Sequence, residues 1–169
     1  DAMTEIFHDE IVISSDSSFF VKRDGKEKSY PAGEQVKMSP EQVKKQGGKW
    51  TFSVPKGRLK VTSITRRGQV PSYRGELVVK WSRKGLVLIN RLSLKEYLYG
   101  VLPGEMSVDY PLEALKAQAV CARTYAYRYL NHPGLPDIGA HVDDSVEYQD
   151  YNNIAENVNS TRAVKVTTG

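Results

Sequence analysis

The hydrophobic pattern of the chain changes near residue 93. Before this point, short runs rich in β-branched and aromatic residues are separated by polar segments that contain glycine or proline, a pattern typical of antiparallel strands joined by turns. We expect strands in six runs, which start at residues 10, 18, 50, 58, 76 and 85: EIVISS, SFFVKR, WTFSV, RLKVTSIT, ELVVKWS and GLVLINRL. The fifth run alternates poorly between apolar and polar residues, which indicates a strand covered on both faces.

The segment between the second and third of these runs, residues 26–49, is polar and broken by several prolines and glycines. We interpret it as turns and loop, with one short helix over Pro40–Lys45 that Ser39 caps. The Asp24-Gly25 pair supplies the turn that follows the second strand.

After residue 93 the period becomes helical. SLKEYLYG predicts a short helix with Ser93 as N-cap and Glu96 at the third position, a capping box, and Pro103-Gly104 should end it. A longer helix should begin at Pro111, with Asp109 or Tyr110 before it, and end near Leu130. One face of that helix carries Leu112, Leu115, Ala119, Ala122, Ala126 and Tyr129. Because alanines let another backbone approach closely, we expect this helix to be central and buried.

The C-terminal pattern is weaker. SVEYQDY, residues 145–151, could pair as a strand, and residues 156–169 predict a helix start followed by the strand VKVTTG. A strand that stops at Gly169 invites a partner, so we expect the domain to be incomplete there. The expected fold class is α+β, with a β-rich N-terminal half beside an Ala-rich helix. Residues 1–70 would be a β-rich part or accessory subdomain, and residues 71–169 the functional core.

Composition narrows the classes of partner. The chain is 40% hydrophobic, enough for a core, and its net charge of +4 with a pI near 9.1 favours anionic partners such as nucleic acid, membrane surface or cell-wall polymer. The cations are scattered and no arginine–aromatic stripe occurs, so nucleic acid is not expected. No apolar run is long enough to span a bilayer. Since the chain opens at Asp1 without an initiator Met, we expect that a membrane anchor has been removed from the N-terminus.

The single cysteine, Cys121, excludes an intramolecular disulfide and a thiolate metal cluster. Its Ala-rich helical surroundings predict a small buried hydrophobic residue rather than a nucleophile.

Three charged residues flank or lie within the long helix. Glu105 should sit just before a helix N-terminus, and Lys116 and Arg123 are seven residues apart, hence on one helical face. If that helix is buried, its cations need partners. The alternative is a solvated loop carboxylate and a solvated basic stripe, and spacing alone leaves both open.

These residues lie in a run that carries a resemblance. EYLYGVLPGEMSVDYPLEALKAQAVCARTYAYRYL, residues 96–130, resembles the stage II sporulation protein D family of peptidoglycan lytic transglycosylases, a family grouped with the amidase enhancers. SYRGELVV and LVLINRLSLKEYL upstream, and DSVEYQDY and NVNSTRAVKVTTG downstream, match further stretches, so the similarity runs from about Tyr73 to the end. The family has Trp-Pro where this chain has Tyr110-Pro111, and its Tyr-His-Ser…Ser-Gly-Gly segment is not in the sequence.

The resemblance implies a role for individual residues. Glu105 matches the catalytic acid, Lys116 and Arg123 match positions of the active-site cleft, and Gln149 and Tyr151 match the glutamine and tyrosine of a downstream motif, where they would bind substrate. Some relatives hold zinc there with a histidine and two cysteines. Here His141 has no cysteine beside it, so we expect no zinc and no other cofactor.

The sequence offers only one strong candidate for a catalytic carboxylate, Glu105, and the chemistry of the family would explain how one is enough. Glycoside cleavage usually needs two, and Asp109 and Glu113 are only weak candidates for the second. In a lytic transglycosylase one Glu protonates the glycosidic oxygen, and the primary hydroxyl of the muramic acid attacks the anomeric carbon, giving an anhydromuramyl end. Glu105 should therefore start protonated in an apolar setting, with Lys116 and Arg123 binding substrate carboxylate or acetyl groups.

The expected partners are peptidoglycan glycan strands in an extracytoplasmic compartment, with Tyr125, Tyr127, Tyr148 and Tyr151 as candidates for stacking on sugar rings. Two other functions stay open. The chain could be a glycan-binding module that stimulates a cell-wall amidase without cutting, or a basic β-domain that binds an anionic polymer by charge alone.

Overall fold

The computed structural model describes residues 5–168, which divide into two compact units, residues 5–92 and residues 93–168. The first unit holds the strands and the second holds all helices of the described chain except one, so the α+β class is confirmed. The division falls after Leu92 rather than at residue 70, because the two strands that follow residue 75 pair with the preceding ones. Asp1 and Gly169, on which two expectations rested, lie outside the described residues.

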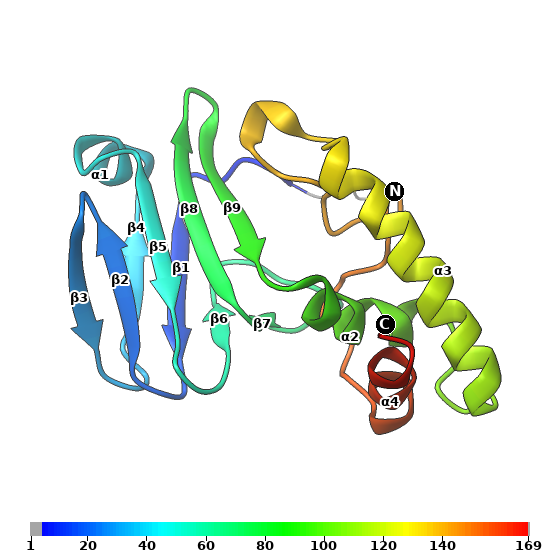
Figure 1. Cartoon of the computed structure of the whole chain (residues 1–169). Coiled ribbons are helices and arrows are strands. Elements are labelled where there is room, and N and C mark those ends of the chain that lie inside the picture. The colour runs from blue at the N-terminus through cyan, green and yellow to red at the C-terminus, as the bar shows by residue number, and fades with distance from the viewer. Residues whose placement is uncertain (1–4, 169) are drawn as a thin grey trace. The chain divides into compact units, whose positions relative to one another are not determined.

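The first unit, which we call the β unit, consists of two antiparallel sheets with the strand orders β3-β2-β5-β8-β9 and β4-β1-β6-β7 (Figure 1). The strands are β1 (Ile11–Ser15), β2 (Phe19–Arg23), β3 (Lys26–Tyr30), β4 (Val36–Met38), β5 (Lys49–Ser53), β6 (Leu59–Val61), β7 (Ser72–Tyr73), β8 (Glu76–Ser82) and β9 (Gly85–Arg91). All six expected runs contain a strand, in agreement with the pattern.

The β unit has an aromatic and aliphatic core. The ring of Phe19 stacks on Tyr30 and on Phe52, with centroid separations of 5.4 and 6.5 Å. Leu77, Val78 and Val79 are buried in succession along β8. Three consecutive buried residues require cover on both faces of the strand, which confirms the interpretation of the poorly alternating run.

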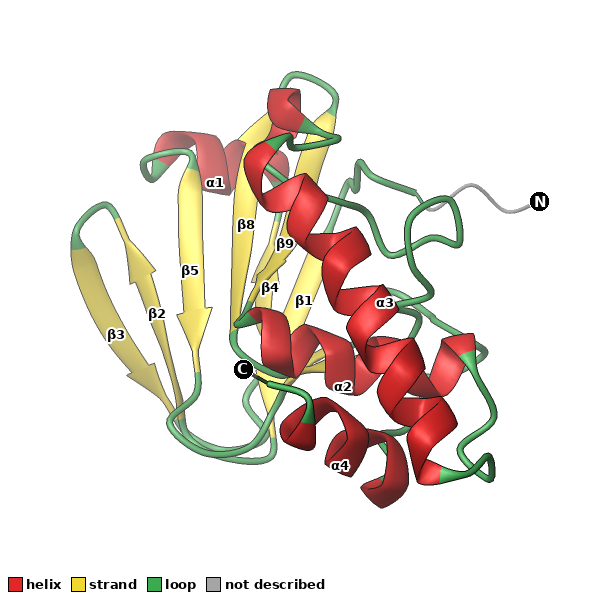
Figure 2. Ribbon diagram, turned by 45° about the vertical axis from the view of Figure 1, so that its right-hand side comes forward, coloured by secondary structure: helices red, strands yellow, loops and turns green. Residues whose placement is uncertain are grey.

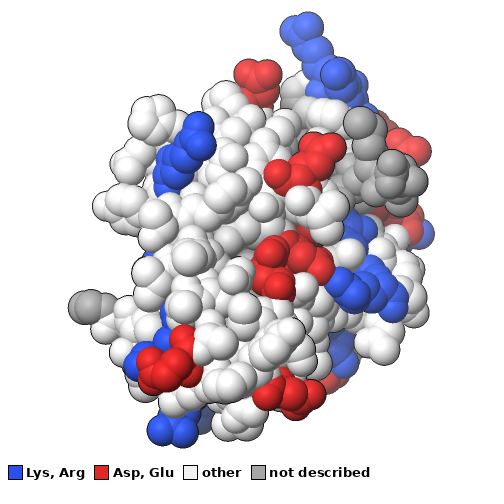
Figure 3. All heavy atoms as spheres, turned by 90° about the vertical axis from the view of Figure 1, so that its right-hand side faces the viewer, with Lys and Arg blue, Asp and Glu red and all other residues white. Residues whose placement is uncertain are grey.

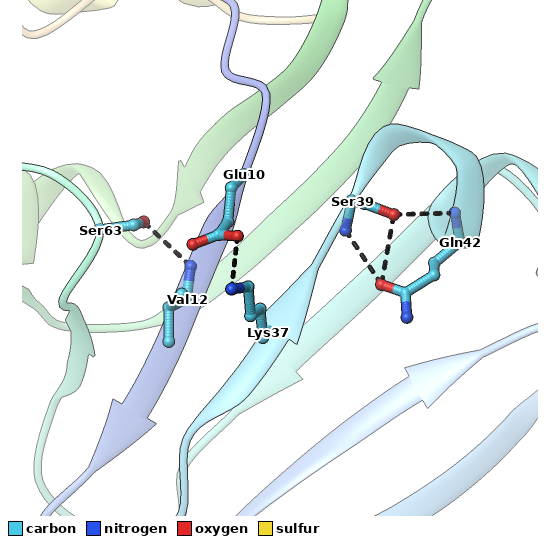
Figure 4. A network of polar contacts seen from close by, with 6 residues as sticks. All are labelled: Glu10, Val12, Lys37, Ser39, Gln42 and Ser63. Atoms are coloured by element: carbon cyan, nitrogen blue, oxygen red, sulfur yellow. Dashed lines mark hydrogen bonds and ion pairs between the residues drawn. The ribbon is translucent and has the colours of Figure 1, made fainter.

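The polar segment 26–49 contains more structure than its composition indicates. The short helix α1 (Pro40–Lys45) is confirmed, with Ser39 and Gln42 forming a reciprocal capping box (Figure 4). The loop assignment of the remainder is wrong, because β3 and β4 form there. β3 is an edge strand with four exposed residues, so it lacks the apolar alternation that marks a strand, and β4 has only three residues.

The run RLKVTSIT forms a shorter strand than expected, since β6 ends at Val61. Beyond it, the side chain of Ser63 accepts a hydrogen bond from the backbone N–H of Val12 at 2.9 Å (Figure 4). A serine hydroxyl thus replaces the backbone partner that a continued strand would supply.

The second unit, which we call the helical unit, contains α2 (Leu94–Glu105), α3 (Leu112–Asn131), the short 3-10 helix η1 (Pro136–Ile138) and α4 (Val158–Val166) (Figure 2). Its core is built by one face of each α-helix, with these buried residues: Leu98, Tyr99, Val101, Leu102, Leu115, Ala119, Ala122, Ala163 and Val164. Among the described helices, none has the length and apolar content needed to cross a membrane.

The helix α3 is buried on one face only, so the expectation of a buried helix holds for the alanine stripe and not for the rest. Val120 is 48% exposed and Tyr127 is 59% exposed on the other side. Cys121 is exposed as well, which corrects its assignment as a buried residue. The stripe of small residues at helical spacing packs against α2 and α4, while the positions between them face solvent, as in an ordinary amphipathic helix.

The C-terminal strands are not formed in the described chain. Residues 145–151 are turns and irregular structure, and the segment expected to be a strand continues α4 to Val166. Asn157 caps this helix by accepting a hydrogen bond from the N–H of Asn159 at 2.8 Å. Ala163 and Val164 enter the core, and that burial outweighs the β-propensity of the valines.

Candidate active site

Glu105 is the last residue of α2, and Met106 follows as the C-cap. The expectation that Pro103-Gly104 would end the helix is therefore wrong, and so is the placement of Glu105 before a helix N-terminus. A proline near the end of a helix removes one hydrogen bond, and the burial of Leu98, Val101 and Leu102 holds the last turns in place. Glu105 thus lies at the negative end of the dipole of α2.

Glu105 is held by the loop of residues 148–154, which we call the docking loop. One carboxylate oxygen, Oε1, accepts a hydrogen bond from the backbone N–H of Asp150 at 2.9 Å. The residue is otherwise exposed, so the expected apolar burial of Glu105 is wrong. One oxygen is fixed by the protein while the carboxyl group as a whole stays accessible to a ligand.

The docking loop reaches α2 because two glycines leave room for it. A Cβ atom on Gly100 would lie 2.7 Å from the ring of Tyr151, and one on Gly104 would lie 2.7 Å from Ile154 Cδ1 and 3.0 Å from Asp150 Oδ2. Such distances are shorter than van der Waals contact. The glycines are four residues apart, hence on one face of the helix, and together they form a flat strip for the loop.

Tyr97 extends the same face of α2 toward its N-terminal end. Its ring packs on that of Tyr151, with centroids 5.0 Å apart. Burial, and after it the proximity of Tyr151 and Glu105, raise the pKa of Tyr97 well above the ordinary value for a phenol. The phenol therefore stays neutral and remains a hydrogen-bond donor at any physiological pH.

Several buried oxygen atoms around this loop have no hydrogen-bond partner among residues 5–168. They belong to Tyr97, Gln149 and Asn152. Gln149 is only 6% exposed, and its Nε2 donates to the carbonyl of Ala122 in α3 at 3.1 Å, which leaves Oε1 as the unused atom. Buried polar atoms are nearly always paired in folded proteins, so three unpaired ones at the docking loop and the adjacent face of α2 point to a ligand or ordered water.

Each of the two predicted cations contacts protein groups other than Glu105, and their role in substrate binding stays a prediction. Lys116 Nζ pairs with Glu113 at 2.9 Å on the surface of α3. Arg123 donates to the carbonyls of Val164 and Thr167, both at 3.1 Å. These carbonyls belong to the last turn of α4 and to the residue after it, which lack partners within the helix. Arg123 therefore has a partner, as expected for a cation in a partly buried helix. That partner is the C-terminal end of α4.

The tyrosines of α3 form a second aromatic group. Tyr129 packs on Tyr125 and on Tyr148, with centroid separations of 5.3 and 5.2 Å. The hydrogen bond between the hydroxyls of Tyr125 and Tyr129, followed by burial, raises the pKa of Tyr125. Tyr148 from this group and Tyr151 from the Tyr97–Tyr151 pair both belong to the docking loop and flank Gln149 in the sequence. Substrate stacking by these rings stays a prediction.

Sequence reasoning missed Asp150 and Tyr97. Asp150 is buried, with 8% exposure, and its carboxyl group lies beside Gly104. Its backbone N–H binds Glu105, so Asp150 is a second carboxylate residue in contact with Glu105. The available signal was the Gly100-x-x-x-Gly104 spacing, which predicts a close approach to α2 by another segment.

The helical unit, which carries the candidate site, contains more acidic than basic residues. Residues 93–169 contain 6 Lys and Arg against 10 Asp and Glu, a net charge of −4. Figure 3 shows the face that carries α3, where acidic and basic side chains lie among uncharged ones rather than in one patch. Over the described residues, no three His, Cys, Asp or Glu side chains gather as a metal site would require. The expected lack of zinc at His141 stays a prediction.

Comparison with known proteins places this geometry in a family context. The model of the family described as Stage II sporulation protein matches residues 82–169, which include all of the helical unit. An uncharacterized protein of Brachyspira hyodysenteriae is 45% identical over 82 residues, which cover 47% of this chain and 22% of that protein. Stage II sporulation protein D of Bacillus amyloliquefaciens is 42% identical over 65 residues, covering 37% and 19% of the two chains.

The amidase enhancer of Bacillus subtilis is 40% identical over 72 residues, which cover 43% of this chain and 9% of the enhancer. The matching segment thus spans about a fifth or less of these relatives. No solved structure matches the chain significantly. Since the family model covers more than half of the residues, including β9 and all of α2, α3 and α4, the chain belongs to the stage II sporulation protein D family.

Proposed function

We propose that the chain carries the active site of a peptidoglycan lytic transglycosylase, with Glu105 as its acid and base. The observation that supports this most is the fixed but accessible carboxyl group of Glu105, held through one oxygen by Asp150 N–H beside buried oxygen atoms that lack protein partners. A carboxyl group with one orientation and one free oxygen is what general acid catalysis requires.

The reaction would proceed without water. Protonated Glu105 donates its proton to the glycosidic oxygen as the bond from that oxygen to the anomeric carbon of muramic acid breaks. The primary hydroxyl of the same sugar bonds to the anomeric carbon, and its proton passes to the Glu105 carboxylate. The products are a shortened strand with a 1,6-anhydromuramyl end and a strand with a free hydroxyl, and Glu105 is protonated again for the next cycle.

Asp150 would assist by charge. Positive charge develops at the anomeric carbon in the transition state, and a carboxylate close to Glu105 stabilises it best in a partly dehydrated position. Asp150 is buried to 8% exposure and lies beside the last turn of α2. The neutral hydroxyl of Tyr97 and the amide oxygens of Gln149 and Asn152 would bind hydroxyl or acetamido groups of the sugars.

Mass spectrometry of a glycan digest tests the assignment. Purified glycan strands, with and without their stem peptides, are incubated with the chain and with Glu105→Gln, which is isosteric and keeps an acceptor for Asp150 N–H. We expect anhydromuramyl ends from the parent chain and none from the variant, with equal thermal stability. Undiminished product from Glu105→Gln would refute the role, and reducing ends in place of anhydro ends would show hydrolysis by the Glu105–Asp150 pair.

A second candidate is a non-catalytic module that holds glycan and stimulates a cell-wall amidase. It is favoured by the similarity to a protein named amidase enhancer and by the exposure of Glu105. In that case the digest contains no new glycan ends, while addition of the chain accelerates peptide release by an amidase. Under either candidate, the chain acts on the cell wall outside the cytoplasm, in wall remodelling of the sporulation type that the relatives' names indicate.

A further inference from the structure

The charges of the chain segregate between the two units. Residues 5–92 contain 18 Lys and Arg against 9 Asp and Glu, a net charge of +9, whereas residues 93–169 have a net charge of −4. The cations are therefore not evenly scattered along the chain, because the β unit holds all of the excess positive charge. The opposite net charges of the two units suggest that the basic unit has a separate role in binding an anion.

Half of these cations gather at one end of the five-stranded sheet. The β2–β3 turn, the segment from α1 to β5, and the β8–β9 turn lie at the same, upper, end of the unit in Figures 1 and 2. Cross-strand pairing joins them, because Arg23 lies opposite both Lys26 and Trp50, and Trp81 N–H donates to the carbonyl of Gly48. We call the cations of these segments the basic rim: Lys22, Arg23, Lys26, Lys44, Lys45, Lys49, Lys80, Arg83 and Lys84.

The rim has far more positive than negative charge. Its three segments, residues 22–27, 44–49 and 80–84, contain nine Lys and Arg against Asp24 and Glu27. Two like-charged pairs stand directly opposite each other across strands, Arg23 with Lys26 and Lys49 with Lys80, an arrangement that destabilises a sheet. An anion bound along this edge would relieve that repulsion.

Several rim cations are available to a ligand. Among the described residues, the following make no ion pair with a carboxylate: Lys22, Lys26, Lys45, Lys49 and Arg83. Others lie over aromatic rings instead, with Arg23 4.7 Å from the ring centre of Trp50 and Lys44 4.7 Å from that of Trp81. Such contacts orient a cation without neutralising it.

The dimensions and composition of the rim select the class of anion. Five strands about 4.8 Å apart span roughly 20 Å, which is too long for one small anion and suits a polymer with repeated charges. Membrane insertion would need exposed apolar anchors. Within residues 5–92, the large hydrophobic side chain that is well exposed is Val70, in the loop between β6 and β7, outside the rim.

We propose that the basic rim binds the carboxylate groups of peptidoglycan, on the lactyl and stem-peptide groups. This inference rests on the proposed function, in which peptidoglycan is the substrate. The helical unit with Glu105 has a net charge of −4 and is repelled by the same polyanion. The rim supplies the attraction that brings the chain to its substrate, and it is separate from the residues that cut.

Co-sedimentation with insoluble peptidoglycan tests the rim without cleavage. The chain carrying Glu105→Gln is the parent. The rim variant adds Lys22→Gln, Lys26→Gln and Lys49→Gln, and the matched control adds Lys37→Gln, Lys56→Gln and Lys60→Gln, which remove the same charge outside the rim. At 50 mM salt we expect the rim variant to bind about tenfold more weakly, and at 500 mM salt the difference should shrink to less than about twofold, because exposed charges are screened. An equal loss in the control would overturn the proposal.

Two further arms identify the ligand chemistry. Amidation of the peptidoglycan carboxyl groups should lower binding of the parent to the level of the rim variant, and unchanged binding would overturn the assignment to carboxylates. Vesicles with about one third phosphatidylglycerol should bind more weakly than peptidoglycan does, and equal binding would overturn it in favour of a membrane. Because cleavage is disabled throughout, a failure to find anhydromuramyl ends leaves this result unaffected.

Discussion

At Gly104, one added methyl group should disturb the assembly of the active site strongly while it changes the stability of α2 only a little. In Gly104→Ala the new Cβ would lie 2.7 Å from Ile154 Cδ1 and 3.0 Å from Asp150 Oδ2. Both atoms belong to the docking loop, and Asp150 also supplies the N–H that holds Glu105. The loop must therefore move away from α2 or become strained.

The energies of the two effects oppose each other. Alanine in place of glycine within a helix stabilises it by about 1 kcal/mol, whereas overpacking of this kind costs about 1–3 kcal/mol. The net change in the free energy of unfolding is then a loss of about 0–2 kcal/mol. If the loop moves instead, Glu105 loses a hydrogen bond to a charged group, worth about 1.5–3 kcal/mol, and activity should fall about 10- to 100-fold.

The assay measures the rate of anhydromuramyl product formation and the midpoint of thermal unfolding on the same samples. We expect a large loss of rate with a small change in stability. The double variant Gly104→Ala/Ile154→Ala removes the nearest contacting atom and should recover part of the rate, as a coupled pair does. Full activity in Gly104→Ala alone, or no recovery in the double variant, would refute the docking of the loop through this glycine.

Two other predictions follow from the helical unit. Arg123→Ala removes the guanidinium that donates to the carbonyls of Val164 and Thr167 and should lower the free energy of unfolding by about 1.5–3 kcal/mol. Thermal unfolding measures this loss, and a weaker affinity for glycan with unchanged stability would instead support the substrate role. Tyr97→Phe removes a buried hydroxyl that has no protein partner among the described residues, so stability near pH 7 should not fall while activity does. Because the folded-state pKa of Tyr97 lies above its ordinary value of 10.0, the folded state keeps a proton that the unfolded state loses, and stability falls as pH rises above 10. Tyr97→Phe should reduce that fall, as urea unfolding at pH 9 and pH 10.5 would measure.

The sequence predicted the elements that rest on local pattern. The strand runs and the capped helix at Ser39 follow from alternation and capping residues, and the buried stripe of α3 follows from its spacing. The exposed edge strand β3 escaped prediction because its residues pair through the backbone, which leaves no apolar signal.

The site was less predictable, because its parts meet through tertiary packing. Glu105 was found through the family resemblance, but its partner Asp150 lies 45 residues away, and no local rule connects them. A charge in an Ala-rich helix was expected to need a partner, and Arg123 has one at the end of α4; its role in substrate binding, which the family resemblance implies, stays a prediction. Pro103 does not end α2, because the hydrogen bond lost with its missing N–H contributes less to stability than the burial of the residues around it.

The opposite signs of the two units also change the meaning of the isoelectric point. A value near 9.1 is an average over a strongly cationic and a moderately anionic body, so neither is neutral at that pH. Bringing a solution to that pH would remove the repulsion between copies and leave their unlike halves free to attract, which favours precipitation at low ionic strength. Moderate salt, which screens the attraction between unlike units, therefore keeps the protein dispersed together with a pH away from the isoelectric point.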